Sequence, residues 1–482
     1  MSADILAIDV GTSAMKLAVF SPELKKAREV QRAYTPTISD GKAEIEPQAW
    51  WQALRDCCAE ASADLARVGV VALSVTTPGL TAMAADGTAL APAVLFLDGR
   101  SHAQSAAIRR LVGERRFLAE TCNLPVSGGS SLSSILWFRD ELPAVWHSAA
   151  MFGHCNTYLV KRMTGRWAID PSTTSITGLY NTSADDLTWN QAVLRSAGIS
   201  EERLPPLLRS YEEVGPLLPS VAAELGLPRQ CGVLCGGNDA VLAALSGGLT
   251  APGDINLISG TCDIVNVCTD RPVASPDFNV RCHVLPGRWL TFFVLNAGGA
   301  ALDWFHRTVC SEKGDGEFYN EYVPGVLESF FHGPDPEARE AQLPGYVPYL
   351  GGSRYALEPL AAAFSGVTLE TSRDDLLLSI IRGNAQYLGE HLASVADLVP
   401  IGRRVGISGG AARIRGMLDA RRRWTGDYEY VFQDQSSLLG AAMLGQINQS
   451  GHLPPGGHVT SGSGHLPVGG HVTSGIGKER RP

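Results

Sequence analysis

The opening run of residues 5–20, ILAIDVGTSAMKLAVF, places an acid and three turn-forming residues between two apolar stretches. Gly11, Thr12 and Ser13 offer backbone N–H groups and hydroxyls, which suit phosphate oxygens. Asp9 lies just before them, and a carboxylate beside phosphates needs a divalent cation between the two. We therefore expect Asp9 to hold Mg²⁺, through water. An ordinary β-hairpin would use the same residues, so this run alone leaves both interpretations open.

A second acid follows the strand-like run 231–234, after the glycines of Cys235-Gly236-Gly237-Asn238-Asp239. The next residues, 240–245, are small and apolar and predict a helix. Glycines there allow close approach of a ligand, and Asp239 would emerge at the mouth of a crevice. Because Asn and Asp also favour helix amino-caps, a capping role is the alternative.

Two further turns lie in the second half of the chain. Gly260 and Thr261 separate the strand-like runs 255–258 and 264–267, which repeats the pattern of the amino-terminal hairpin. One such turn in each half is what a two-domain clamp on a triphosphate requires. Gly409, Gly410 and Ala411 follow the strand-like run 405–408, and bare backbone there would accommodate adenine or ribose. A plain helix start is the alternative for that glycine turn.

The elements that would position these residues alternate between strand and helix. Helical spacing over residues 50–68 leads into a strand predicted at 68–75, and another apolar run at 93–97 ends in Asp98-Gly99-Arg100. This order predicts an α/β fold with ligand groups at the ends of its strands.

Composition limits the class of protein. A chain of 482 residues fits two large domains, and its net charge of -9 argues against a nucleic-acid partner. The sequence has neither a GxxxxGK[ST] loop nor a GxGxxG turn after a strand. It contains no signal-like start and no long apolar run, so we expect no membrane association and a cytoplasmic location. Its ten cysteines are scattered and are expected to be reduced thiols.

The four turns in this order resemble the FGGY carbohydrate kinases of the actin-like ATPase superfamily, over residues 5–445. Six further strings follow that family's order: EIEPQAWWQAL, LFLDGR, TYLVKRMTG, NAGGAALDWF, VPYLGGSR and SLLGAAMLG. The resemblance is strongest to the xylulokinase members. It implies two ribonuclease-H-like α/β domains with an active-site cleft between them, ATP and Mg²⁺ as cofactors, and a small-molecule sugar substrate.

The resemblance also assigns roles to the residues. Asp239 matches the catalytic base and a metal-associated position, and Asp9 matches the metal-associated acid. Gly11, Thr12 and Ser13 match the first phosphate loop, and Lys16 is either in reach of a phosphate or solvated. Gly260 and Thr261 match the second phosphate loop, and Gly409, Gly410 and Ala411 match the adenosine-side turn. The sugar pocket is matched by Thr77, Pro78, Asp98, Arg100 and Asp239. A surface turn with an ion pair is the alternative for Asp98 and Arg100.

The substrate is the least determined feature. Xylulokinases carry a QMHG-like string where this chain has Thr76-Thr77-Pro78-Gly79, so Pro78 replaces the histidine, and Ala240 follows Asp239 where many members have Asn. Both changes remove polar contacts. D-xylulose, phosphorylated to D-xylulose 5-phosphate, is the leading substrate. Another ketopentose such as ribulose, a polyol such as glycerol, a sugar acid such as gluconate, or a non-catalytic sensor remain alternatives.

The expected domains are an amino-terminal sugar-binding domain (1–237), a carboxyl-terminal nucleotide-binding domain (238–449) and a flexible tail (450–482). The tail contains the near-duplicate segments GHLPPGGHVTSGS and GHLPVGGHVTSGI, which are too poor in apolar residues to form a core. A homodimer is compatible with the family resemblance, and the sequence leaves the oligomeric state open.

Overall fold

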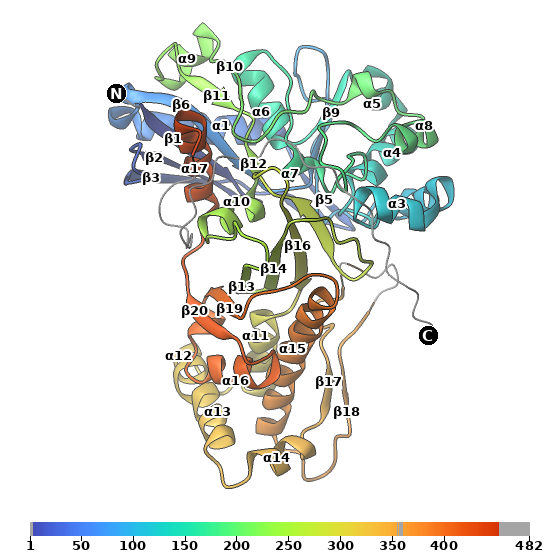
Figure 1. Ribbon diagram of the computed structural model, residues 1–482, viewed down its shortest axis with the longest axis vertical. Coiled ribbons are helices and arrows are strands. Elements are labelled where there is room, and N and C mark those ends of the chain that lie inside the picture. The colour runs from blue at the N-terminus through green and yellow to red at the C-terminus, as the bar shows by residue number, and fades with distance from the viewer. Residues whose placement is uncertain (1–2, 354, 356–359, 453–482) are drawn as a thin grey trace.

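A computed structural model describes residues 3–353, 355 and 360–452 of the chain (Figure 1). Most of the predicted tail, from residue 453 onward, lies outside the described residues. No helix within the described ranges is both long and apolar enough to cross a membrane. All ten cysteines are free thiols.

A mixed sheet in the amino-terminal half carries the first predicted turn. Its strands follow the order β10-β11-β6-β1-β2-β3, with β12 beside β6. Their bounds are β1 (Asp4–Val10), β2 (Ala14–Phe20), β3 (Lys26–Ala33), β6 (Val68–Val75), β10 (Glu213–Pro216), β11 (Gly232–Leu234) and β12 (Gly237–Asn238). β1 runs antiparallel to β2 and parallel to β6, and apolar side chains on both faces of β1 and β6 are buried. The strands predicted from the apolar runs before and after the first turn are therefore confirmed.

The amino-terminal half also contains a second sheet and a set of helices. The second sheet has the order β4-β5-β8-β7-β9, with β4 (Thr37–Ser39), β5 (Lys42–Ile45), β7 (Gly79–Met83), β8 (Ala93–Leu95) and β9 (Met151–Gly153). The helices are α1 (Pro47–Glu60), η1 (Ser62–Arg67), α2 (His102–Ile108), η2 (Arg109–Gly113), α3 (Glu114–Thr121), α4 (Ser131–Glu141), α5 (Pro143–Ser148), α6 (Cys155–Thr164), α7 (Pro171–Thr174), α8 (Gln191–Ala197), η3 (Glu201–Arg203), α9 (Pro219–Leu225) and α10 (Asp239–Ser246). The helix predicted over residues 50–68 is shorter, because α1 ends at Glu60 and a 3₁₀ turn leads into β6.

The carboxyl-terminal half is built on a sheet of order β15-β16-β14-β13-β19-β20. Its strands are β13 (Ile255–Ser259), β14 (Asp263–Thr269), β15 (Asn279–Cys282), β16 (Trp289–Leu295), β19 (Arg404–Ser408) and β20 (Glu429–Phe432), and a separate pair comprises β17 (Gly345–Val347) and β18 (Ala363–Ser365). The helices are α11 (Gly299–Val309), α12 (Asp315–Glu317), η4 (Phe318–Tyr322), α13 (Val323–Phe331), α14 (Pro336–Gln342), α15 (Arg373–Ala396), η5 (Ala411–Arg413), α16 (Met417–Trp424) and α17 (Ser437–Ser450). The predicted strands on both sides of Gly260 and Thr261 are confirmed as β13 and β14.

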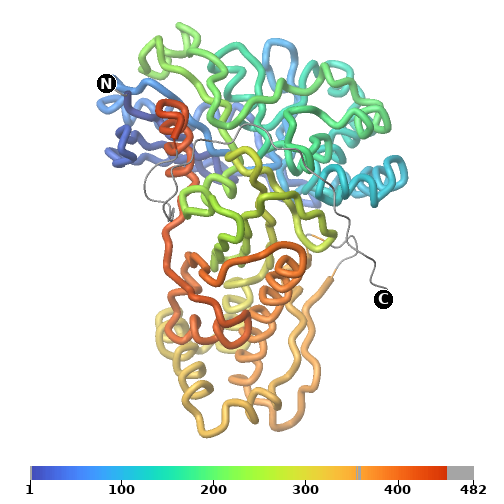
Figure 2. Tube along the Cα trace, in the orientation of Figure 1, coloured from blue at the N-terminus to red at the C-terminus, as the bar shows by residue number. Residues whose placement is uncertain are grey.

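The last helix returns to the first sheet. Both ribbon and tube show α17, at the red end of the chain, beside the blue amino-terminal strands (Figures 1 and 2). Gln446 Nε2 donates a hydrogen bond to Pro22 O at 2.7 Å, and Gln449 Nε2 donates one to Ala3 O at 3.0 Å. One hydrophobic cluster contains residues of β1, α10 and α17 together. The division into domains 1–237 and 238–449 stays a prediction, since this packing joins the two ranges.

Candidate active site

The first predicted turn is held at the end of the β1–β2 hairpin. Gly11 N donates to Ala14 O at 2.9 Å, and the Tyr34 hydroxyl donates to Gly11 O at 2.6 Å. Thr12 is half-buried, whereas Ser13 is exposed. Both contacts engage backbone atoms of Gly11, so the hydroxyls of Thr12 and Ser13 are not needed to hold the turn and suit an anion.

Asp9 lies one residue before the end of β1, between two strands. It pairs with Lys16 across β2 and with Ser74 across β6, and Ser74 Oγ donates to Asp9 Oδ1 at 2.7 Å. Burial raises the pKa of Asp9, while hydrogen bonds from Ser74 and Ser437 and the charge of Lys16 oppose that shift. Lys16 is exposed. Asp9 therefore sits in a partly buried position that would favour a cation next to it.

Asp239 is the first residue of α10, and the preceding residue caps the helix instead. Asn238 Oδ1 accepts from Val241 N at 3.1 Å. Asp239 Oδ1 accepts from Ala240 N at 2.7 Å and from Asn238 Nδ2 at 3.0 Å. Asn238, and not Asp239, therefore caps α10. The Asp239 carboxylate is instead oriented by its hydrogen bonds with Ala240 and Asn238.

The surroundings of Asp239 raise its pKa to about 6. Burial is the largest cause and the charge of Asp9 adds to it, whereas the guanidinium of Arg281 and the bonds from Ala240 and Asn238 oppose it. The charges of the two predicted acids, Asp9 and Asp239, therefore influence each other. A carboxylate with a pKa near neutrality is suited to take up and release protons.

A buried polar network lies behind Asp239. Asn238 N donates to Ser172 Oγ at 2.9 Å, and the Ser210 hydroxyl donates to Asp170 Oδ2 at 2.7 Å. Ser172 N and Ser172 Oγ also donate to Asp170 Oδ2, and burial raises the pKa of this carboxyl group. Asp170 therefore fixes the backbone that carries Asn238 and Asp239, a role that the sequence analysis missed. The pattern Asp-Pro-Ser, which begins a helix with a side-chain cap, was the available signal.

Thr77 is linked to Asp239 through the side chain of Asn238, and its hydroxyl oxygen accepts two hydrogen bonds. Asn238 Nδ2 donates to Thr77 Oγ1 at 2.7 Å, and Arg281 Nη1 donates to the same oxygen at 3.0 Å. Pro78 follows in the same buried loop, between β6 and β7. The sequence analysis identified Thr77 and Pro78 but missed Arg281. The available signal was a charged residue within the mostly apolar run Val280 to Leu285, because arginine is seldom buried in a strand.

Asp98 and Arg100 form a local ion pair. The Asp98 carboxylate, 2% exposed, accepts from Ala43 N at 2.9 Å and Arg100 N at 3.0 Å, and Arg100 Nη2 lies 2.7 Å from it. Arg100 also contacts Glu44 at 2.8 Å and stacks 4.4 Å above the Trp137 ring. These contacts already engage the charges of both side chains, so their role in a sugar pocket stays a prediction.

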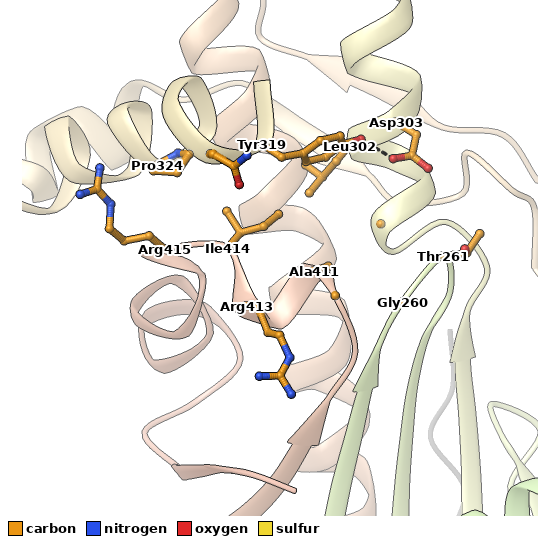
Figure 3. A pocket seen from close by; sticks show the side chains of 13 residues that line it. Gly260, Thr261, Leu302, Asp303, Tyr319, Pro324, Ala411, Arg413, Ile414 and Arg415 are labelled. Atoms are coloured by element: carbon orange, nitrogen blue, oxygen red, sulfur yellow. Dashed lines mark hydrogen bonds between the residues drawn. The ribbon is translucent and has the colours of Figure 1, made fainter. Parts of the chain in front are cut away.

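The third and fourth predicted turns meet in one cleft, with a volume of about 830 Å³. Gly260, Thr261, Gly410 and Ala411 line it. Figure 3 shows Leu302 and Tyr319 on the opposite side of this cleft from Ala411, Ile414 and Arg413. Apolar surfaces on both sides and backbone turns at one end suit a nucleotide with its phosphates at Gly260 and Thr261. Gly11, Thr12, Ser13 and Asp239 are not part of this lining.

A buried ion pair between Asp263 and Arg421 lies next to the Gly260 turn. Asp263 Oδ2 lies 2.5 Å from Arg421 Nη2, and Ser259 Oγ donates to Asp263 Oδ1 at 2.9 Å. Both charged side chains are buried. Gly299 N donates to Gly260 O at 2.8 Å, which ties the turn to the start of α11.

The glycine turn after β19 differs in part from its prediction. Gly409 adopts φ +96°, and a Cβ atom there would lie 2.1 Å from Ser259 O. A short 3₁₀ turn (η5) follows, and the helix α16 begins only at Met417. The close approach of Gly409 to β13 explains why the fourth turn lies next to the third one.

The chain is similar to several known proteins. The model of the FGGY family of carbohydrate kinases, N-terminal domain, matches residues 5–246, which end with α10. The chain is 26% identical to the xylulose kinase of Escherichia coli, covering 92% of this chain and 89% of that protein. It is 24% identical to the gluconokinase of Bacillus subtilis, covering 92% and 87%. The crystal structure of xylulose kinase from Rhodospirillum rubrum superposes with a TM-score of 0.85 at 22% identity, over 93% of this chain and 91% of that chain.

The chain shares its mixed α/β fold with this solved xylulose kinase. The chain belongs to the FGGY family of carbohydrate kinases. As a member of that family it is an ATP-dependent sugar kinase with a small-molecule sugar substrate.

Proposed function

We propose that the protein transfers the γ-phosphoryl group of ATP to a sugar hydroxyl, with Asp239 as the general base. A sugar hydroxyl is a weak nucleophile at neutral pH, so a carboxylate must accept its proton as the new bond to phosphorus forms. The observation that carries the proposal is the position of Asp239 at the start of α10, held by Asn238 and with its pKa raised to about 6.

The nucleotide in this proposal lies in the cleft lined by Gly260, Thr261, Gly410 and Ala411. The N–H groups of the Gly260 turn and of the Gly11 turn would hold phosphate oxygens from two sides. Lys16 would contribute a cation on the first side, and Gly409 would keep the backbone close to the adenosine. Closure of the two halves would exclude water, which otherwise competes as an acceptor.

Asp9 and Asp239 fit a Mg²⁺ ion held together with the phosphates. The charge of Asp9 raises the pKa of Asp239, so a cation beside both would relieve their repulsion. Within the described ranges, no group of three or more His, Cys, Asp or Glu residues gathers to hold a metal ion. The remaining ligands would therefore be water and phosphate, which Mg²⁺ commonly retains. When bound, the ion would neutralise charge on the phosphoryl oxygens.

Two classes of acceptor have support. D-xylulose is the leading acceptor because several relatives are xylulose kinases, and the product would be D-xylulose 5-phosphate. A gluconate-type sugar acid is the second candidate, because gluconokinases are about equally similar and Arg281 places a cation next to Thr77. Thr77, Pro78, Asp98 and Arg100 remain the proposed sugar-side residues. A cytoplasmic location is proposed because ATP is the donor.

The proposal is tested by ADP release from ATP and Mg²⁺ with a panel of pentuloses, polyols and aldonates. We expect release that depends on one acceptor class. Hydrolysis that is independent of any acceptor would favour a chaperone-like ATPase instead. Thermal stabilisation by a sugar without turnover would favour a sensor.

The variant Asp239→Asn tests the role of the base directly. We expect kcat to fall by about 100- to 10,000-fold, because the amide cannot accept the hydroxyl proton. The affinity for an ATP analogue, measured by calorimetry, should change by less than about 3-fold, since the nucleotide cleft does not include Asp239.

The matched control is Asp427→Asn, because the Asp427 side chain is 90% exposed and pairs only with Arg403 among the ion pairs of the described residues. This control should keep wild-type turnover. Near-normal turnover by Asp239→Asn would refute the assignment of the base.

A further inference from the structure

The Gly260 turn (residues 260–262) joins β13 to β14 at the nucleotide cleft (Figure 3). Its two ends are the paired residues Ser259 and Asp263, and Ser259 Oγ donates to Asp263 Oδ1 at 2.9 Å. Within the turn, Gly260 N donates to Cys262 O at 3.0 Å. These contacts close the hairpin around the three residues of the turn.

Arg421 of α16 reaches both ends of this turn from a distant part of the chain. Its Nη2 donates to Asp263 Oδ2 at 2.5 Å and to Ser259 Oγ at 3.2 Å. Arg421 is 5% exposed and Asp263 is 1% exposed, so solvent ions screen their attraction little. Because a guanidinium is planar and makes directed hydrogen bonds, this contact fixes the two strand ends relative to α16.

The start of α11 fixes the direction of the peptide groups in the turn. Gly299 N donates to Gly260 O at 2.8 Å, and Ala300 N donates to Thr261 O at 3.1 Å. In a planar trans peptide unit the N–H points opposite to the C=O, so the N–H groups of Thr261 and Cys262 point away from these helix contacts. Successive N–H groups on one side of a turn suit an anion. The turn thus presents two donors for phosphate oxygens.

The buried pair of Arg421 and Asp263 is a poor source of stability by itself. Moving two charges out of water is costly, and their attraction offsets that cost only when the remaining polar groups are also satisfied. Arg421 Nε and Nη1 have no hydrogen-bond partner among the described residues. Two apolar side chains of similar size would therefore give equal or higher stability. They would not reproduce the bonds from one cation to both ends of the turn.

We infer that Arg421 is a positioning residue for the phosphates of ATP. By bonding to Ser259 and Asp263, it holds the Gly260 turn in the shape that presents the N–H groups of the turn to phosphate oxygens. Arg421 acts through the turn, since it is not among the residues that line the nucleotide cleft. This inference rests on the proposed function, because that function places the phosphates at this turn.

The experiment compares a ligand that carries phosphates with one that lacks them. In Arg421→Met, the Kd of a non-hydrolysable ATP analogue, measured by calorimetry, should rise by about 10-fold or more. The Kd of adenosine, measured by NMR titration, should change by less than about 3-fold. The KM for ATP should rise with the Kd of the analogue, while the KM for the sugar stays within about 3-fold. Arg421→Lys should give an intermediate Kd, because an ammonium lacks the planar fork of donors.

The double variant Asp263→Leu/Arg421→Met separates positioning from stability. Leucine has nearly the shape of aspartate, and both new side chains are apolar, so the midpoint of urea unfolding should rise or stay within about 0.5 M of wild type. The Kd of the ATP analogue should still rise by about 10-fold. Wild-type affinity for the analogue in this double variant would overturn the inference. Equal losses of analogue and adenosine binding in Arg421→Met would also overturn it.

The matched control is Arg422→Met. Arg422 is the next residue of α16 and pairs with Asp419 at 2.9 Å, but its side chain is 47% exposed. This control should bind both ligands as the wild type does. If it weakened binding of the analogue as much as Arg421→Met does, the charge of α16 and not the turn would be responsible, and the inference would fail.

Gly260→Val distinguishes a failure of the proposed function. A Cβ atom at Gly260 would meet Cys262 O at 3.6 Å, an ordinary contact, so the hairpin has room for a side chain at the proposed phosphate site. If Gly260→Val binds the ATP analogue as tightly as the wild type, the phosphates lie elsewhere, and the proposed placement of ATP fails together with the inference. If Gly260→Val loses binding while the double variant keeps it, only the inference is overturned.

Discussion

At the residue scale, the environment of Asp239 determines what its carboxylate can do. Asn238 caps α10, so Asp239 does not have to. Asp239 Oδ1 is oriented by hydrogen bonds from Ala240 N and Asn238 Nδ2. Burial and Asp9 raise its pKa, and Arg281 limits the rise. Helix capping alone does not require the charges of Asp9 and Arg281 near Asp239, so this environment indicates a functional carboxylate.

The pH dependence follows from the pKa of about 6 for Asp239. Protonated Asp239 cannot accept the hydroxyl proton, so kcat/KM should fall about 10-fold per pH unit below that pKa. Because Arg281 lowers this pKa, Arg281→Met should move the acidic limb to higher pH. A kcat/KM profile for wild type and variant measures both effects. A flat profile between pH 5 and pH 7 would contradict the assignment.

The same pKa predicts the stability of Asp239→Asn. The folded pKa lies above the unfolded value, so the ionised carboxylate costs stability at high pH, and this cost shrinks as the pH falls through about 6. The variant should therefore have a higher Tm than wild type at pH 8 and a similar Tm at pH 4. Thermal unfolding at the two pH values provides the check.

At the element scale, parallel pairing of β13 with β19 brings two distant turns to one edge of the sheet. Ile258 pairs with Ser408, so the chain leaves both strands at the same level, at Gly260 and at Gly409. The approach is so close that Gly409 has no room for a side chain beside Ser259. The nucleotide cleft depends on this juxtaposition rather than on either turn alone.

Two neighbouring alanine substitutions test this packing. In Gly409→Ala the new methyl group would meet Ser259 O at a backbone with φ +96°, so we expect a loss of about 2–4 kcal/mol of unfolding free energy. In Gly410→Ala the methyl group would meet no atom of the described residues within 4 Å, and the loss should stay below about 0.5 kcal/mol. Urea denaturation compares the two. Equal stabilities would show that the turn adapts.

At the scale of the whole molecule, the carboxyl-terminal helix α17 closes the fold on the amino-terminal sheet. Its first residue, Ser437, lowers the pKa of Asp9, and Gly445 lies directly on β1. A Cβ atom at Gly445 would lie 2.6 Å from Ile5 Cγ2. The site therefore depends on contacts between the two ends of the described chain.

Gly445→Leu should separate α17 from β1. We expect it to lower the unfolding free energy by about 1–3 kcal/mol, because the larger side chain overpacks the shared core. Far-UV circular dichroism and tryptophan fluorescence should shift together in urea, as one cooperative transition. Asn448→Leu, at an exposed position of the same helix, should cost less than about 1 kcal/mol. Two separate transitions in the wild type would show that the ends fold independently.

The local elements around the site could be predicted from the sequence. Apolar runs that flank Gly-Thr turns predict hairpins, and β1, β2, β13 and β14 are found there. The small-residue helix after Asp239 and the strand over residues 68–75 are also confirmed. These features depend on neighbours within a few residues, so the order of side chains is enough to determine them.

The contacts that give the site its chemistry come from residues far apart in the chain. Arg281 lies 204 positions from Thr77, and Arg421 lies 158 positions from Asp263. No periodicity or spacing relates such pairs. The sequence by itself determined the family, the turns and the acids. Only the tertiary structure decided that Asn238 caps α10, that Asp98 is already engaged by Arg100, and that Arg281 donates to Thr77, because burial and charge depend on which distant segments pack together.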